Sequence, residues 1–145
     1  MTVALSLLVL SAPAAQTPRA LPEALTQMIQ AERDFAARAL VVGWKQAFLD
    51  YFADDAVGFE ERAGPAKDQI RANPDPPADL QLIWEPRYGD ISASGELGYL
   101  TGPVRNVRKS RDNGRPRHST YASLWKRQRD GSFKVSAPGQ LVTNN

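Results

Sequence analysis

Residues 117–137 read RHSTYASLWKRQRDGSFKVSA, and this stretch decides the fold class. Tyr121, Ser123 and Trp125 recur at every second position, which is the side-chain period of a β-strand. Asp130-Gly131 supplies the residues of a tight hairpin turn, and residues 133–137 predict the returning strand. The stretch therefore predicts an antiparallel pair of strands with aromatic side chains on one face.

Two upstream runs extend this pair into a meander. Leu80, Leu82 and Trp84 alternate with other residues in a run predicted to reach Ile91, and residues 92–96 (SASGE) form the next turn. A second strand is predicted over residues 97–109. Asn113-Gly114, a strong hairpin signal, separates it from the strand at residue 117. The C-terminal half is therefore predicted to be a sheet of three or four long antiparallel strands.

The N-terminal half carries helical patterns instead. Apolar residues recur at helical spacing from Pro22 to Leu40, and Gly43 can end this helix because glycine tolerates the left-handed conformation. A second helix is predicted over residues 44–53, a short strand over 56–60 and a short helix over 65–72. Together these elements predict an α+β fold, with the long helix lying across one face of a curved, mainly antiparallel sheet. Such a cone can hold a small molecule at its open end.

Composition narrows the class of protein. A chain of 145 residues predicts a single domain, which we place at residues 22–140. There is no cysteine and only one histidine, so we expect neither disulfides nor a transition-metal site, and no cofactor motif is present. The net charge of +2 is too small to indicate nucleic acid as a partner. No apolar run reaches the roughly 20 residues of a membrane-spanning helix.

The N-terminus has the pattern of an export signal. Residues 3–10 (VALSLLVL) are apolar, and Ala12 and Ala14 fit the small-residue rule for signal peptidase. We expect a signal peptide over residues 1–15 with cleavage after Ala14 or Ala15, a linker at 16–21 and a tail at 141–145. The mature protein would then be periplasmic or secreted. No lysine or arginine precedes the apolar run, so an apolar arm packed on the domain is the alternative.

Four motifs resemble the nuclear transport factor 2-like superfamily, in its SnoaL-like branch and its exported bacterial domains of unknown function. They are AERDFA (31–36), FLDYFADDAVGF (48–59), SGELGYLTG (94–102) and YASLWKRQRDGSFKV (121–135). The resemblance covers about residues 22–137 and implies the α+β cone. This fold hosts isomerases, cyclases, dehydratases and carriers, so it does not fix an activity. It also implies a homodimer formed through the outer face of the sheet.

The motif ADDA (53–56) resembles the same motif in ketosteroid isomerases, and this resemblance places Glu60 at the position of their general base. A carboxylate there could abstract a proton next to a carbonyl group. The isomerases also need hydrogen-bond donors for the enolate, whereas Phe35 and Ala36 on the first helix cannot donate. The alternative for Glu60 is a solvated strand end or a local ion pair. Asp54-Asp55 is interpreted as a turn between helix and strand instead of a metal-binding pair.

Glu32 interrupts the apolar stripe of the first helix, three residues from both Ile29 and Phe35, so it is predicted to point inward. A buried carboxylate must be paired or protonated. We expect a hydrogen bond to a Tyr, a Trp or the backbone that joins helix to sheet, with a role in a ligand pocket as the alternative.

The remaining candidate residues lie on the predicted strands. Trp84, Tyr99, Tyr121 and Trp125 either pack in the core or line the mouth of the cone, where Tyr and Trp combine an apolar wall with a polar group. His118 is predicted to be exposed at the rim, and a catalytic role is the alternative because histidine titrates near neutrality.

Six cations surround the expected hairpin tip: Arg105, Arg108, Lys109, Arg111, Arg115 and Arg117. They are either a solvated surface that resists aggregation or a site for an anionic partner such as an envelope surface or an acidic ligand. The leading hypothesis for the whole chain is an exported domain that binds a small, partly apolar molecule. The alternatives are an isomerase or dehydratase with Glu60 as base, and an envelope interaction module that uses residues 105–117.

Overall fold

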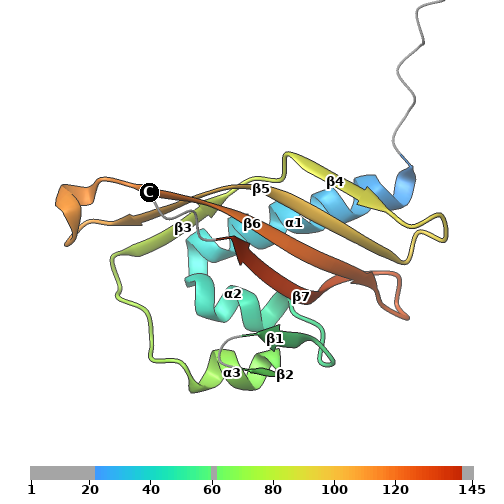
Figure 1. The fold of residues 1–145 in the computed structure, drawn as a ribbon, viewed down its shortest axis with the longest axis horizontal. Coiled ribbons are helices and arrows are strands. Elements are labelled where there is room, and N and C mark those ends of the chain that lie inside the picture. The colour runs from blue at the N-terminus through green and yellow to red at the C-terminus, as the bar shows by residue number, and fades with distance from the viewer. Residues whose placement is uncertain (1–21, 60–61, 142–145) are drawn as a thin grey trace, which may run out of the picture.

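The computed structural model of the protein describes residues 22–59 and 62–141. The expected signal peptide, the expected linker over residues 16–21 and Glu60 lie outside these ranges, as do residues 142–145. Within them the chain forms a helical N-terminal half and an antiparallel sheet (Figure 1). The α+β prediction is therefore confirmed.

The long helix α1 spans Glu23–Val42 and buries Leu25, Met28, Glu32, Phe35 and Ala39, which recur every three or four residues. Gly43 ends it at a φ of 83°, a conformation that side chains disfavour, and its N–H donates to the carbonyl oxygen of Ala39. The next helix, α2 (Trp44–Tyr51), begins at once. Because one glycine joins the two helices, α2 folds back beside α1 (Figure 1).

A small subdomain of β1, β2 and α3 follows α2. Strands β1 (Val57–Phe59) and β2 (Ala63–Pro65) pair antiparallel, and α3 spans Ala66–Ala72. The predicted strand and short helix are thus present within one residue of their expected bounds.

The main sheet contains β3 (Leu80–Trp84), β4 (Tyr88–Ile91), β5 (Leu97–Arg108), β6 (Arg117–Arg127) and β7 (Phe133–Leu141), all paired antiparallel in the order β3-β5-β6-β7. β4 also pairs with β5, beyond the end of β3. The expected single strand to Ile91 is therefore interrupted at residues 85–87. Pro86 lies in this interruption and has no N–H with which to continue a ladder. β7 runs four residues past the predicted end at Ala137.

The turn between β5 and β6 is wider than a two-residue hairpin. The last pair of the ladder joins Asn106 to Arg117, and the loop contains a short 3₁₀ segment, Asp112–Gly114. Asn113 and Gly114 both have positive φ, 54° and 72°. Asn-Gly therefore supplies the predicted change of direction, within a longer loop that projects beyond the helical layer (Figure 1).

The core lies between α1, α2 and the facing side of the sheet. Its apolar members include Met28, Phe35, Leu100, Trp125 and Val135, none of which is more than 3% exposed. Burying such side chains contributes roughly 1.5–3 kcal/mol each. At Gly102 the sheet comes so close to the 85–87 interruption that a Cβ would collide with the carbonyl oxygen of Glu85.

Candidate functional site

The Glu32 carboxylate lies at the centre of the cone and is 1% exposed. Its Oε1 accepts a hydrogen bond of 2.7 Å from the indole N–H of Trp84. Its Oε2 accepts bonds from the Trp125 indole at 2.8 Å and from the Ser123 hydroxyl at 2.7 Å. The expected hydrogen bond between α1 and a tryptophan of the sheet is therefore present, and a serine on the same face as Trp125 adds to it.

These contacts limit what Glu32 can do chemically. Burial raises the pKa of its carboxyl, while the hydrogen bonds from Ser123, Trp84 and Trp125 oppose that rise. Both oxygens already accept hydrogen bonds from neutral donors, and the residue is 1% exposed, whereas a general base must lie within hydrogen-bond reach of the proton that it removes. Glu32 therefore joins helix to sheet in this structure.

Aromatic side chains fill the space around the carboxylate. The Phe35 ring packs edge-on against Trp84 at 5.0 Å and Trp125 at 6.2 Å between centroids. It also stacks on Tyr51 at 5.0 Å. Phe48 extends the cluster from Phe35 to the Trp44 ring at the start of α2, 5.3 Å away. Trp84 and Trp125 thus pack in the core, which was the first of the two alternatives predicted for them.

Two hydrogen-bond donors in this region have no partner among the described residues. They are the hydroxyl of Tyr121, on the same face of β6 as Ser123 and Trp125, and the indole N–H of Trp44. Burial, followed by the charges of Glu32 and Glu85, raises the pKa of the Tyr121 hydroxyl far above its ordinary value, so it stays a neutral donor. A buried donor without an acceptor costs about 1–3 kcal/mol. The sequence places Trp44 at the start of the second predicted helix, but it gives no sign that the indole N–H is unpaired.

The structure separates the other two strand residues from this cluster. Tyr99 lies between the buried Gly98 and Leu100 and is 46% exposed, so core packing, the first of its two alternatives, is wrong. The period of two puts its side chain on the outer face of the sheet. His118 is exposed on β6, paired in register with Arg105, as expected for a rim position.

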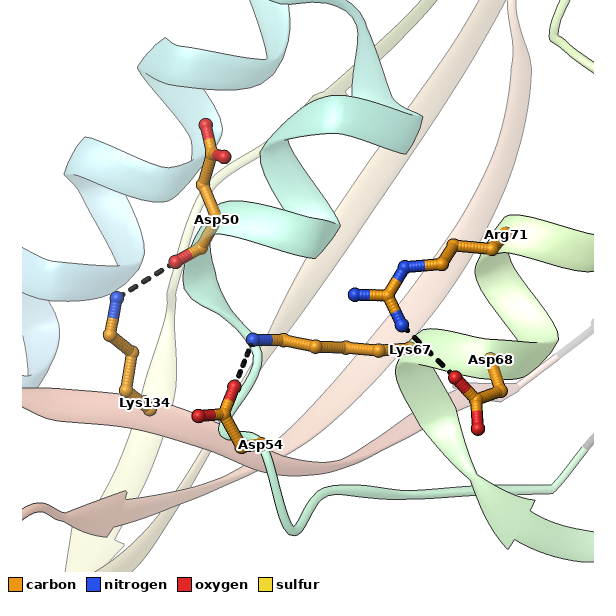
Figure 2. Close-up of polar contacts among 6 residues, drawn as sticks. All are labelled: Asp50, Asp54, Lys67, Asp68, Arg71 and Lys134. Atoms are coloured by element: carbon orange, nitrogen blue, oxygen red, sulfur yellow. Dashed lines mark hydrogen bonds and ion pairs between the residues drawn. The ribbon is translucent and has the colours of Figure 1, made fainter.

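The two carboxylates of the ADDA motif are held by lysines from different elements. Lys67 of α3 donates to Asp54 at 2.6 Å (Figure 2), and Lys126 of β6 donates to Asp55 at 3.0 Å. These contacts lower the pKa of both aspartates, chiefly through the hydrogen bond in each case. The interpretation of Asp54-Asp55 as a turn agrees with this arrangement. No cluster of metal-ligating side chains occurs in residues 22–59 and 62–141.

Lys134 and Arg71 complete the charged surface below α2. Lys134 donates to the backbone carbonyl of Asp50 at 2.8 Å, and Arg71 pairs with Asp68 within α3 at 3.0 Å (Figure 2). Each of these two cations therefore has an acceptor within the protein. We interpret their contacts as joining elements of the fold and not as a binding site.

The six cations of the hairpin lie mainly at the surface. Arg105, Lys109, Arg115 and Arg117 are exposed, whereas Arg108 pairs with Asp79 at 3.7 Å at the base of the hairpin. Asp79 also accepts the backbone N–H of Ser110 at 2.6 Å. The hairpin base is therefore tied to the segment before β3, and its tip remains cationic.

Comparison with solved structures identifies the architecture. An NTF-2 like protein of unknown function from Shewanella oneidensis superposes with a TM-score of 0.60 at 11% identity, covering 80% of this chain and 97% of that one. The chain has the nuclear transport factor 2-like fold. A ketosteroid isomerase-like protein from Erwinia carotovora shares this fold, with a TM-score of 0.54 at 15% identity over 85% of this chain and all of that one.

A third similar structure comes from Catenulispora acidiphila and was solved in complex with S-DNPA. Its TM-score is 0.55 at 12% identity, covering 80% of this chain and 90% of that one. No family model matches the sequence, and no curated protein is significantly similar to it. At these identities the likeness concerns the fold. No helix in the described part of the chain has the length and apolar character needed to cross a membrane.

Proposed function

We propose that this chain binds a small, partly apolar molecule in the cone, without catalysing a reaction. The unpaired Tyr121 hydroxyl carries the proposal, because a buried donor without an acceptor is satisfied when a ligand supplies one. The Trp44 N–H offers a second donor. The surrounding aromatic rings provide an apolar wall of the kind found in ligand sites. The Glu32 carboxylate is occupied by three donors, which favours binding over proton transfer.

Native mass spectrometry of the gently purified protein tests this proposal. The wild-type protein is expected to carry a defined additional mass, which Tyr121→Phe and Trp44→Phe each reduce. Tyr88→Phe is the matched control, because Tyr88 is 76% exposed outside the cone. Equal retention by Tyr121→Phe and wild type would refute the role of the hydroxyl, and a ligand-free wild type would favour one of the alternatives.

We also propose that the mature protein lies outside the cytoplasm. The apolar run over residues 3–10 and the small residues that follow support export. Intact mass and N-terminal sequencing of protein from the native host are expected to give a chain that begins at Ala15 or Gln16. A chain that retains Met1 would contradict export.

An isomerase or dehydratase that uses Glu60 as general base is the second candidate. The ADDA motif and the fold shared with a ketosteroid isomerase-like protein favour it. Tyr121 and Trp44 would then be the donors that stabilise an enolate oxygen. Hydrogen–deuterium exchange next to the carbonyl of a cyclic ketone tests this alternative. A general base predicts a rate loss of roughly 10²–10⁴-fold in Glu60→Gln, with Glu61→Gln unchanged.

We also propose that two copies associate through the outer face of the sheet. This face exposes Leu97, Tyr99 and Leu124, and Tyr99 pairs with Leu124 in the ladder, so their side chains are adjacent. Sedimentation velocity is expected to show a dimer that Tyr99→Lys and Leu124→Lys convert to monomer. A monomeric wild type would contradict this assembly.

Binding to an anionic envelope surface is the third candidate, and the exposed cations of residues 105–117 favour it. Charge reversal at Arg111 and Arg115 is expected to abolish retention on anionic vesicles, while reversal at Arg71 leaves it unchanged. Unchanged retention after reversal at the hairpin would count against this candidate.

A further inference from the structure

A groove of about 460 Å³ runs between α1 and β4, and the core aromatic cluster described above contributes none of its lining residues. Leu25, Ile29 and Arg33 line it from the helix. Pro86, Arg87 and Gly89 line it from the start of β4 and the segment before it. The two sides therefore come from parts of the chain more than 50 positions apart, which the fold brings together.

The helical side of the groove changes from apolar to charged along its length. Its three residues recur at intervals of four, so they follow one another along the same face of α1. At 1.5 Å per residue, Arg33 lies about 12 Å along the axis from Leu25. Leu25 is buried and Ile29 partly buried, whereas Arg33 is exposed. The groove thus has an apolar end and a cationic end.

The strand side of the groove has its arginine at the same end as the helical side. The bond between Glu32 and Trp84 places the start of the 85–91 segment beside the Arg33 end of the groove. Met28 lies 2.7 Å from the position of a Cβ at Gly98, which pairs with Ile91, so β4 ends nearer Leu25. Helix α1 and strand β4 accordingly run in opposite directions (Figure 1). Arg87 therefore lies toward the Arg33 end.

Both arginines of the groove are able to bind an additional anion. The residues of the described chain that line the groove include both arginines and no carboxylate. Arg33 makes no hydrogen bond or ion pair with the residues that the structure describes. Arg87 pairs with Glu85 at 3.1 Å, but its side chain is 59% exposed and that of Glu85 54%. Such an exposed pair is weak, so Arg87 can exchange it for another anion at little cost.

We propose that this groove binds a soluble, single-chain amphipathic anion, with its carboxylate between Arg33 and Arg87 and its hydrocarbon tail along Ile29 and Leu25. Guanidinium groups bind carboxylates through paired, charge-assisted hydrogen bonds. The apolar end removes the tail from water, which stabilises the complex in proportion to the area buried. The groove volume of about 460 Å³ suits one chain of a free molecule.

Calorimetry with three small probes tests the proposal on the full-length protein. Decanoate combines head and tail, 1-decanol keeps the tail without the charge, and acetate keeps the charge without the tail. Decanoate is expected to bind at least about tenfold more tightly than either of the others. The double variant Arg33→Gln/Arg87→Gln is expected to weaken decanoate by roughly 10–100-fold, the loss of one or two charge-assisted bonds, and to leave 1-decanol unchanged.

Two matched variants fix the location. Arg71→Gln removes an arginine on α3 that is as exposed as Arg87, and it is expected to leave decanoate binding unchanged. Tyr121→Phe is expected to leave it unchanged as well, which separates this groove from the ligand proposed for the cone. NMR should show decanoate-dependent shifts at the Leu25 and Ile29 methyl groups.

Four outcomes would overturn the inference. Equal affinity for decanoate and 1-decanol would mean that the arginines select nothing. Equal affinity for decanoate and acetate would mean that the groove contributes nothing. A loss in Arg71→Gln as large as in the double variant would indicate a general effect of net charge. Binding to vesicles that contain phosphatidylglycerol, without binding to monomeric decanoate, would indicate a membrane surface instead.

Discussion

The indole N–H of Trp125 donates to the Oε2 atom of Glu32 across 2.8 Å, although the two residues are separated by 93 positions in the sequence. Trp84 completes the connection from the other side at 2.7 Å. One helix is thereby fixed to two strands by a single carboxylate, and the consequences for stability can be measured.

Glu32→Gln is expected to destabilise the protein by about 2–4 kcal/mol. The amide retains one acceptor oxygen and turns an N–H₂ group toward donors that need an acceptor. Urea denaturation measures the loss. Glu23→Gln, at the exposed start of the same helix, is the control and should change stability by less than about 0.5 kcal/mol. Equal losses in the two variants would contradict the role of the network.

The stability difference between wild type and Glu32→Gln is expected to depend on pH. Burial raises the pKa of Glu32 above its ordinary value of 4.5, so the folded state holds this proton more tightly than the unfolded state. The stabilisation that this protonation equilibrium contributes to folding is complete below pH 4.5, and it falls as the pH rises through the pKa of Glu32 in the folded state. Urea midpoints of both proteins from pH 4 to pH 8 test this, and a difference that grows with pH would mean a lowered pKa.

Tyr121→Phe is expected to leave the stability of the ligand-free protein unchanged or to raise it by up to about 1 kcal/mol. The hydroxyl is buried without a partner, so its removal deletes no hydrogen bond and relieves a desolvation cost. Thermal unfolding measures the change. A clear loss of stability would show that the hydroxyl already has an acceptor.

Gly102→Ala is expected to destabilise the protein by about 2–3 kcal/mol, because the new methyl group would meet the carbonyl oxygen of Glu85, a backbone atom that cannot move aside. Gly139→Ala is the control, since its Cβ would lie 3.2 Å from the nearest atom, the Ala122 carbonyl oxygen. Chemical denaturation should separate the two variants, and similar losses would contradict the close approach at Gly102.

The contact between Asp79 and the hairpin base is expected to weaken in acid. Hydrogen bonds from Ser110, the side chain first and then the backbone, lower the pKa of Asp79 below 3.8, with a further contribution from Arg108. The stabilisation that ionised Asp79 provides is present above pH 3.8, and it is lost as the pH falls through the pKa of Asp79 in the folded state. The protection of the Ser110 amide from hydrogen exchange, relative to its intrinsic rate at each pH, should therefore fall in that range, and Asp79→Asn should remove this dependence.

Local patterns in the sequence predicted the elements that they control. Helical spacing gave α1 and the inward position of Glu32, and Gly43 marked the joint with α2. The period of two gave the shared face of Tyr121, Ser123 and Trp125. These predictions succeeded because each depends on the geometry of a single element.

Features that depend on the neighbours of an element were missed. β7 continues through Pro138 because it is an edge strand of the sheet, where a proline needs no partner for its missing N–H. Whether a strand lies at an edge depends on the whole topology. For Tyr99 the sequence left core packing and the mouth of the cone as alternatives, whereas its parity with the buried Gly98 and Leu100 places its side chain on the outer face. The missing partners of Tyr121 and Trp44 depend on every surrounding side chain.

The spacing of the donors on β6 has a consequence for how the sheet is assembled. Ser123 and Trp125 face Glu32 because they are two residues apart, and Leu124 between them faces the opposite side. A slip of β6 by one residue would turn Leu124 toward the carboxylate and both donors away from it. The slip would also turn Trp125 out of the core, and of the three described donors it would leave the buried carboxylate with the Trp84 N–H alone, so it carries a polar cost in addition to the hydrophobic one. Glu32 therefore discriminates between the correct alignment of the strands and its nearest competitor.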